Sequence, residues 1–280
     1  MTNYRGLLVL MVAVVLLLGG ALTHAQQQPL WELGAGASLL SFPDYRGSGD
    51  TQQYLLPMPY VIYRGEYLKA DRHGVRGVVF DSERIEINAS VSASLPVDSR
   101  HATARVGMPN LHPTLELGPS LDVTLWRSAN LRYRFDLRLP VRLGISFESP
   151  YRSFGWQVSP RINADINDVA GWPGWNLGLL AGPLYGSRTY HDYFYSVAPQ
   201  YVTLARPSYD ARGGHAGVQW LVAVSKRFPS YWVGGFMRGD YLDAAVFADS
   251  PLVQSKNYVA AGMAIAWIIG TSKQQVTVTE

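Results

Sequence analysis

Hydrophobic and polar residues alternate strictly over several long stretches of this chain. From Leu131 to Phe147, 17 residues, every odd-numbered position is apolar or aromatic. The even-numbered positions carry the charged residues Arg132, Arg134, Asp136, Arg138 and Arg142. A period of two residues places the two sets on opposite faces of one extended strand, whereas strands of soluble sheets usually have about 5–6 residues. This length and this pair of faces are typical of a membrane barrel wall, so we expect the charged set to face the lumen.

Similar alternation recurs along the chain and predicts an all-β fold, a transmembrane antiparallel up-and-down β-barrel. The predicted strands are 31–41, 51–63, 66–72, 74–80, 83–97, 112–126, 130–147, 154–167, 174–185, 212–226, 231–246 and 257–269. An even number of strands brings both ends of a closed barrel to the same side of the membrane. The hairpin of 66–72 and 74–80 has the weakest pattern, and without it the barrel would have ten strands.

Long and short connections alternate between the predicted strands. If the first strand runs outward, the long connections all lie outside the cell: 42–50, 98–111, 148–153, 186–211 and 247–256. The short turns near Arg64-Gly65, Ser128-Asn130 and Phe228-Ser230 then lie on the periplasmic side. Long outer loops and short inner turns are the usual asymmetry of such barrels.

The N-terminus has the pattern of an export signal. Arg5 precedes an apolar run of 12 residues, Leu7 to Leu18, and a small-residue region ends at Ala25. A retained helical anchor would need about 20 apolar residues, so we interpret 1–25 as a cleaved signal peptide. The predicted organisation is therefore a signal peptide (1–25), an outer-membrane barrel (26–270) and a polar periplasmic tail (271–280).

Composition narrows the class of protein further. Charged residues make up 16% of the chain, the formal net charge is only +3, and there is no cysteine. The small net charge gives no support to nucleic-acid binding, and the chain has no thiol for a disulfide or a lipid anchor. The expected surroundings are outer-membrane lipid, in a bacterial cell outer membrane.

The richest cluster of chemically active side chains lies in the longest predicted outer loop. It comprises Tyr190, His191, Asp192, Tyr193, Phe194 and Tyr195. A hydrolase would use Ser187 as nucleophile and His191 as base, but adjacent His and Asp side chains do not normally face each other, and no G-x-S-x-G motif is present. We therefore predict no enzymatic activity and a loop that packs aromatic side chains into the barrel mouth. A surface for a ligand or partner is the alternative, because tyrosine combines large contact area with a polar tip.

Neither a metal nor a cofactor is predicted. The histidines show no H-x-x-x-H spacing, and the Gly47-Ser48-Gly49 stretch lacks the lysine of a phosphate-binding loop. The arginine row has two interpretations. It favours anions in a wet lumen, or it is neutralised by Asp136 and by Glu116, Asp122 and Asp165 on neighbouring strands. We favour neutralisation, because carboxylates lie on both adjacent strands.

Five short motifs, in order, resemble the MltA-interacting protein/outer-membrane-protein-V family. They are Asp44-Tyr45-Arg46-Gly47-Ser48, Leu56-Pro57-Met58-Pro59-Tyr60, Gly118-Pro119-Ser120-Leu121, the stretch from Tyr185-Gly186-Ser187 to Tyr195, and Ala248-Asp249-Ser250-Pro251-Leu252-Val253. The resemblance implies an outer-membrane barrel and, for one branch, a scaffold that joins a lytic transglycosylase to a bifunctional murein synthase. Other members are associated with adhesion, osmotic response or antibiotic susceptibility. The chain departs from the usual pattern in ending on a polar tail rather than on an aromatic residue.

Two classes of function follow. The first is a non-enzymatic scaffold in peptidoglycan assembly, which the resemblance implies. The alternative is a small-solute channel, or a surface adhesin or receptor, which the polar inner face and the outer loops suggest.

Overall fold

The computed structural model describes residues 26–278, so the predicted signal peptide lies outside the described residues. The strands in chain order are β1 (Gln26–Pro29), β2 (Trp31–Pro43), β3 (Thr51–Arg64), β4 (Leu68–Asp71), β5 (Gly74–Asp81), β6 (Ile85–Ser94), β7 (Thr114–Arg127), β8 (Tyr133–Ser146), β9 (Arg152–Val158), β10 (Arg161–Ile166), β11 (Trp175–Gly186), β12 (Gly214–Arg227), β13 (Tyr231–Tyr241), β14 (Asn257–Thr271) and β15 (Gln275–Val278). Helix α2 (Arg188–Tyr195) and the 3-10 helices η1 (Thr103–Arg105) and η2 (Pro199–Tyr201) lie in the loops. None of the helices in this part of the chain has the length and apolar character needed to span a bilayer.

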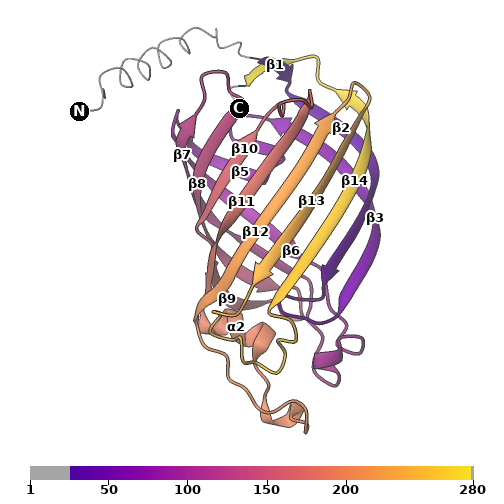
Figure 1. Cartoon of the computed structure of the whole chain (residues 1–280), viewed down its shortest axis with the longest axis vertical. Helices are drawn as coiled ribbons and strands as arrows, with labels where there is room; N and C mark the ends of the chain where they lie inside the picture. Colours follow the sequence, from indigo (N-terminus) through magenta and orange to yellow (C-terminus); the bar gives the residue numbers. More distant parts are fainter. Residues whose placement is uncertain (1–25, 279–280) are drawn as a thin grey trace, which may run out of the picture.

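An antiparallel sheet of 13 strands closes on itself (Figure 1). Because β9 and β10 both pair with β8 and β11, they are successive halves of one strand, and the wall has twelve strands. The interruption falls at Ser159-Pro160, where the proline has no N–H to donate to the ladder. The prediction of an all-β, closed antiparallel barrel of twelve strands, including the hairpin of β4 and β5, is confirmed.

Several predicted strands have different ends, and two of them show the cause. The strand predicted for 130–147 begins only at Tyr133, because Leu131 has a φ of 56° in a tight turn. The strand predicted for 231–246 ends at Tyr241, and Leu242 begins a turn closed by its carbonyl and the N–H of Ala245, 2.9 Å apart. Apolar residues in turns continue the alternation by chance, which is why the pattern extends both strands too far.

Apolar side chains cover the outside of the wall. Leu39, Leu143 and Met263 are examples on three different strands, with 47%, 55% and 65% of their surface exposed. The alternate positions of the wall strands point inward. Asp136 of β8 and Asn88 of β6 are examples, and both are buried. This is the reverse of a soluble barrel and matches a wall surrounded by lipid.

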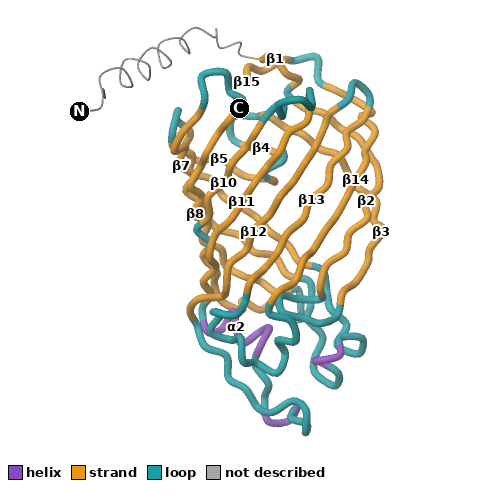
Figure 2. Tube along the Cα trace, in the orientation of Figure 1, coloured by secondary structure: helices purple, strands orange, loops and turns teal. Residues whose placement is uncertain are grey.

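The two ends of the barrel differ (Figure 2). One end carries short turns and both ends of the described segment 26–278, where β1 pairs with β15 as a separate two-stranded sheet from Gln26↔Val278 to Pro29↔Gln275. Part of the predicted polar tail thus forms a strand. The other end carries the long loops and α2, which enclose an apolar core that includes Tyr45, Leu242 and Phe247. The largest buried apolar cluster therefore lies in the loops rather than inside the wall.

Candidate functional site

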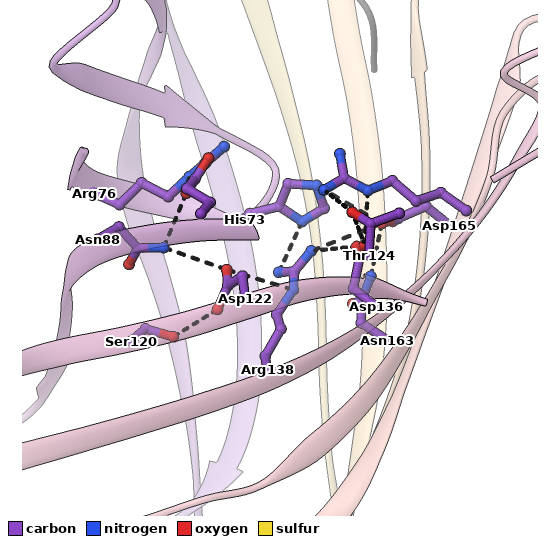
Figure 3. A network of polar contacts seen from close by, with 12 residues as sticks. His73, Arg76, Asn88, Ser120, Asp122, Thr124, Asp136, Arg138, Asn163 and Asp165 are labelled. Carbon is purple, nitrogen blue, oxygen red and sulfur yellow. Dashed lines mark hydrogen bonds and ion pairs between the residues drawn. The ribbon is translucent and has the colours of Figure 1, made fainter. Parts of the chain in front are cut away.

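The hairpin of β4 and β5 sends its tip into the barrel lumen (Figure 3). His73 in the tip contacts Arg138 of β8 through Nδ1 at 3.2 Å and approaches Asp165 of β10 at 3.7 Å. The neighbouring Arg72 donates to Asn167 Oδ1 at 2.7 Å. These contacts reach across the lumen to strands that are not neighbours of the hairpin, so the tip crosses the interior instead of lying in the wall.

A network of paired charges surrounds this tip. Arg138 lies 3.5 Å from Asp136 and 3.9 Å from both Asp122 and Asp165. Asp136 is completely buried and also accepts from Arg134 Nε at 2.8 Å. Burying a charge is costly in free energy unless the charge is paired and hydrogen-bonded. The lumen at this level is consequently filled by side chains that neutralise one another.

The remaining residues of the predicted arginine row lie elsewhere. Arg132 is in the turn before β8, half exposed, and pairs with Asp168 at 3.1 Å, so its expected place on the inner face of the strand is wrong. Arg142 points into the lumen, where its Nε donates to Ser90 Oγ at 3.0 Å. Arg161 of β10 also lines the lumen, and its Nε is buried without a hydrogen-bond partner. Over residues 26–278, neither Arg142 nor Arg161 forms a salt bridge.

The predicted interaction loop is the helix α2, which closes the loop end of the barrel. Ser187 caps it by accepting from the backbone N–H of Tyr190 at 3.2 Å. Tyr190 donates to Glu116 Oε1 at 2.6 Å and accepts from Gln157 at 3.0 Å, which joins the helix to the inner wall.

Aromatic rings fix the same helix against its surroundings. The rings of Tyr195 and Phe247 stack with centroids 3.7 Å apart, and those of Tyr193 and Phe154 stack at 4.6 Å. The Tyr195 hydroxyl donates to the carbonyl of Arg46 at 3.0 Å. Burial raises the pKa of Tyr195, as expected for a phenol without water around it.

The three residues of the hydrolase interpretation have separate structural partners. His191 Nδ1 lies 2.6 Å from the carbonyl of Arg212, and Asp192 accepts from Ser196 Oγ at 2.7 Å, while Ser187 caps the helix. Burial lowers the pKa of His191, and the hydrogen bond to Arg212 opposes this shift. The geometry gives no relay from Asp192 through His191 to Ser187.

A cavity of about 550 Å³ lies between the charged network and α2. His73 belongs to its lining on one side, and Tyr190 and Tyr195 belong to it on the other. Its polar lining includes Arg142 and Arg161. In the described part of the chain, His, Asp and Glu side chains form no group of three that would suit a metal ion.

Three further ion pairs were not predicted from the sequence. Arg46, within the first of the five motifs, lies 2.6 Å from Asp240 of β13. Burial by itself lowers the pKa of Arg46, but the Asp240 carboxylate outweighs burial and raises this pKa above its ordinary value. At the opposite end Glu32 pairs with Arg64 at 2.9 Å and with Arg227 at 2.6 Å. The charged positions were visible in the sequence, but their partners are far apart in the chain.

Comparison with known proteins identifies one family. The family model described as MltA-interacting protein MipA matches residues 35–269. No curated protein matches the sequence. Among solved structures, a bacterial polysaccharide outer membrane secretin is similar, with a TM-score of 0.43, 9% sequence identity, and coverage of 86% of this chain and 99% of that chain.

Proposed function

Because the chain belongs to the MltA-interacting protein MipA family, we propose that it is a non-enzymatic outer-membrane barrel that binds a lytic transglycosylase of the MltA kind. The family match over residues 35–269 is the observation that carries this proposal. A bifunctional murein synthase is the second partner in the scaffold that the resemblance implies. In this role the barrel brings peptidoglycan hydrolase and synthase together and performs no reaction itself.

Membrane insertion is supported by the outer face of the wall. Leu39, Leu143 and Met263 are exposed on strands whose backbone hydrogen bonds are satisfied by neighbouring strands. In hydrocarbon, backbone polar groups need internal partners, and neighbouring strands on both sides supply them for β2, β8 and β14.

The end that carries both chain ends is the proposed docking surface. Murein enzymes act in the periplasm, and the β1–β15 sheet adds a folded element to the short turns there. A two-stranded sheet leaves strand edges that a partner segment can extend through main-chain hydrogen bonds.

A pull-down with purified components tests the scaffold. The refolded barrel should retain a purified MltA-type transglycosylase, and deletion of 275–278 should weaken retention at least tenfold. Replacing Tyr193 of α2 by Ala is the matched control at the opposite end and should leave retention unchanged. Binding that is lost only through loop changes would favour a surface receptor or adhesin instead.

The channel alternative makes a different forecast. Side chains of the hairpin tip, β8 and β10 meet across the lumen, so planar bilayers containing the protein should stay electrically silent. Discrete conductance steps whose anion preference weakens when Arg134, Arg138 and Arg142 become Gln would support a channel.

A further inference from the structure

The barrel wall is incomplete beside β3. This strand pairs with β2 along its whole length, but it pairs with β4 only at Tyr63↔Ala70 and Arg64↔Lys69. Residues 51–62 therefore have a strand partner on one side only.

Strand β6 forms the other edge of this gap in the wall, opposite β3. The last pair between β5 and β6 on this side joins Arg76 to Ser90, so residues 91–94 are held only by β7. No pairing between β3 and β6 is present within residues 26–278. The cause is the short hairpin, whose tip enters the lumen instead of continuing in the wall.

Two prolines fit this open edge of β3. The N–H of Arg64 donates to the carbonyl of Leu30 at 2.8 Å, on the β2 side, and antiparallel pairing alternates along the strand. Even-numbered residues of β3 therefore bond to β2, and odd-numbered residues direct their backbone groups to the opening. Pro57 and Pro59 are odd-numbered, so their nitrogen atoms face the opening. Because proline has no N–H, neither nitrogen needs a hydrogen-bond partner there, as is usual for proline on an edge strand.

Contacts at both ends define the opening. At the loop end, Asp50 accepts from the backbone N–H and the hydroxyl of Thr103 at 2.6 and 2.9 Å and so connects the loops that follow β2 and β6. At the other end the hairpin tip with His73 forms the boundary. The lumen cavity reaches this opening, because Tyr54 of β3 and both Val91 and Ala93 of β6 belong to its lining.

The cavity behind the opening has two kinds of wall. One wall carries Arg142 and Arg161 without salt bridges, and the nearby Glu116 is engaged by the Tyr190 hydroxyl at 2.6 Å. The apolar lining begins on β11, next to the strand of Arg161, and continues over β12, β13, β14 and β2: Leu180, Leu184, Leu221, Phe236, Ala260 and Phe42. Its volume of about 550 Å³ lies within the roughly 300–1,000 Å³ usual for small-molecule sites.

We propose that this cavity binds a single-chain amphiphile with an anionic head group, which enters from the membrane through the opening between β3 and β6. The head group, a carboxylate or a phosphate, lies against Arg142 and Arg161, and the acyl chain lies along the apolar wall. Arginines removed from water bind such anions strongly. The proposal depends on the membrane location proposed above, and it is independent of the scaffold role.

Binding to the full mature barrel in phosphatidylcholine nanodiscs tests the proposal. Native mass spectrometry would compare palmitate, lysophosphatidylglycerol and monopalmitin, which share one acyl chain and differ in the head group. We expect the two anionic probes to bind at least tenfold more tightly than neutral monopalmitin. Their relative affinities distinguish a free fatty acid from a lysophospholipid as the source of the anion.

Variants separate the head-group site from the chain site. The double change Arg142→Gln and Arg161→Gln should weaken palmitate binding at least tenfold without affecting monopalmitin, and Arg132→Gln in the exposed turn is the matched control. Ser92→Trp, which fills the cavity beside the opening, should weaken both probes. If the double variant fails to fold, Arg142→Lys and Arg161→Lys retain the charge and should retain binding.

Photolabelling tests the path of entry. Palmitate with a diazirine at its chain end should label Tyr54 and the apolar cavity wall, as read by peptide mass spectrometry. Labels confined to the outer face of the barrel, or anionic probes that bind no better than monopalmitin, would overturn the proposal. Failure of transglycosylase binding would leave it intact, which keeps the two proposals separable.

Discussion

At the scale of single residues, stability depends on how each buried charge is paired. Asp136 has no exposed surface and contacts both Arg134 and Arg138, whereas Asp168 pairs with Arg132 in an exposed turn. The same type of ion pair therefore occurs in two very different environments.

Replacing Asp136 by Ala should lower the free energy of unfolding by about 3–5 kcal/mol, because the buried guanidinium of Arg138 and the partly buried one of Arg134 lose their shared carboxylate. The change Asp168→Ala should cost at most about 1 kcal/mol, as usual for an exposed pair. Urea titrations of the folded barrel, followed by tryptophan fluorescence, measure both. Equal losses would mean that the lumen network is solvated.

At the scale of elements, the sequence predicts wall strands well and their interruptions poorly. Alternation depends on each residue and its neighbours, so β7, β11 and β14 lie within two residues of their expected ends. The β4–β5 tip turns inward because His73 contacts Arg138 and Asp165, which are distant in sequence. A pattern of alternating neighbours does not predict such contacts. The capping residue Ser187 was a local signal for α2, but the aromatic run was interpreted as an irregular loop.

Closure by α2 should depend on pH through His191. Burial lowers the pKa of His191 below the ordinary 6.5 while α2 is packed in the barrel mouth, which we call the docked state. Below pH 6.5 the undocked helix therefore takes up a proton more readily than the docked helix. Docking is therefore fully stable above that pH and weakens as the pH falls through it. Hydrogen exchange of residues 188–195 should be faster at pH 5 than at pH 7.5.

The variant His191→Gln provides the control for this effect. Glutamine has no charge in this range, so hydrogen exchange in the helix, corrected for its intrinsic pH dependence, should become independent of pH. A difference between pH 5 and pH 7.5 that persists in the variant would assign the effect to another group.

At the scale of the whole molecule, an apolar outer belt surrounds a lumen filled at two levels, by the charged network and by α2. Leu139 and Arg138 are adjacent on β8, yet one side chain belongs to the belt and the other to the network. The barrel therefore exposes on its outer face the kind of side chain that a soluble protein buries.

Leu139→Arg should destabilise the inserted barrel by about 2–4 kcal/mol if the residue lies near the bilayer midplane. Unfolding in lipid vesicles, with folded and unfolded forms separated by their different migration in unboiled gels, gives the free energy. The same change at Leu204, an exposed loop residue, should have little effect. Tolerance of arginine at both positions would contradict a membrane location.

The separate sheet of β1 and β15 also has a consequence for biogenesis. Gln27 and Thr277, which hydrogen-bond at 2.9 Å, are 250 positions apart, and Glu32 meets Arg227 across 195 positions. Strand β1 therefore cannot acquire its strand partner before the last segment of the chain is present. Contacts of such long sequence separation form slowly and leave apolar strands uncovered in the meantime. The order of strand β1 is thus tied to completion of the chain, and a chain that lacks residues 275–278 leaves β1 without its strand partner.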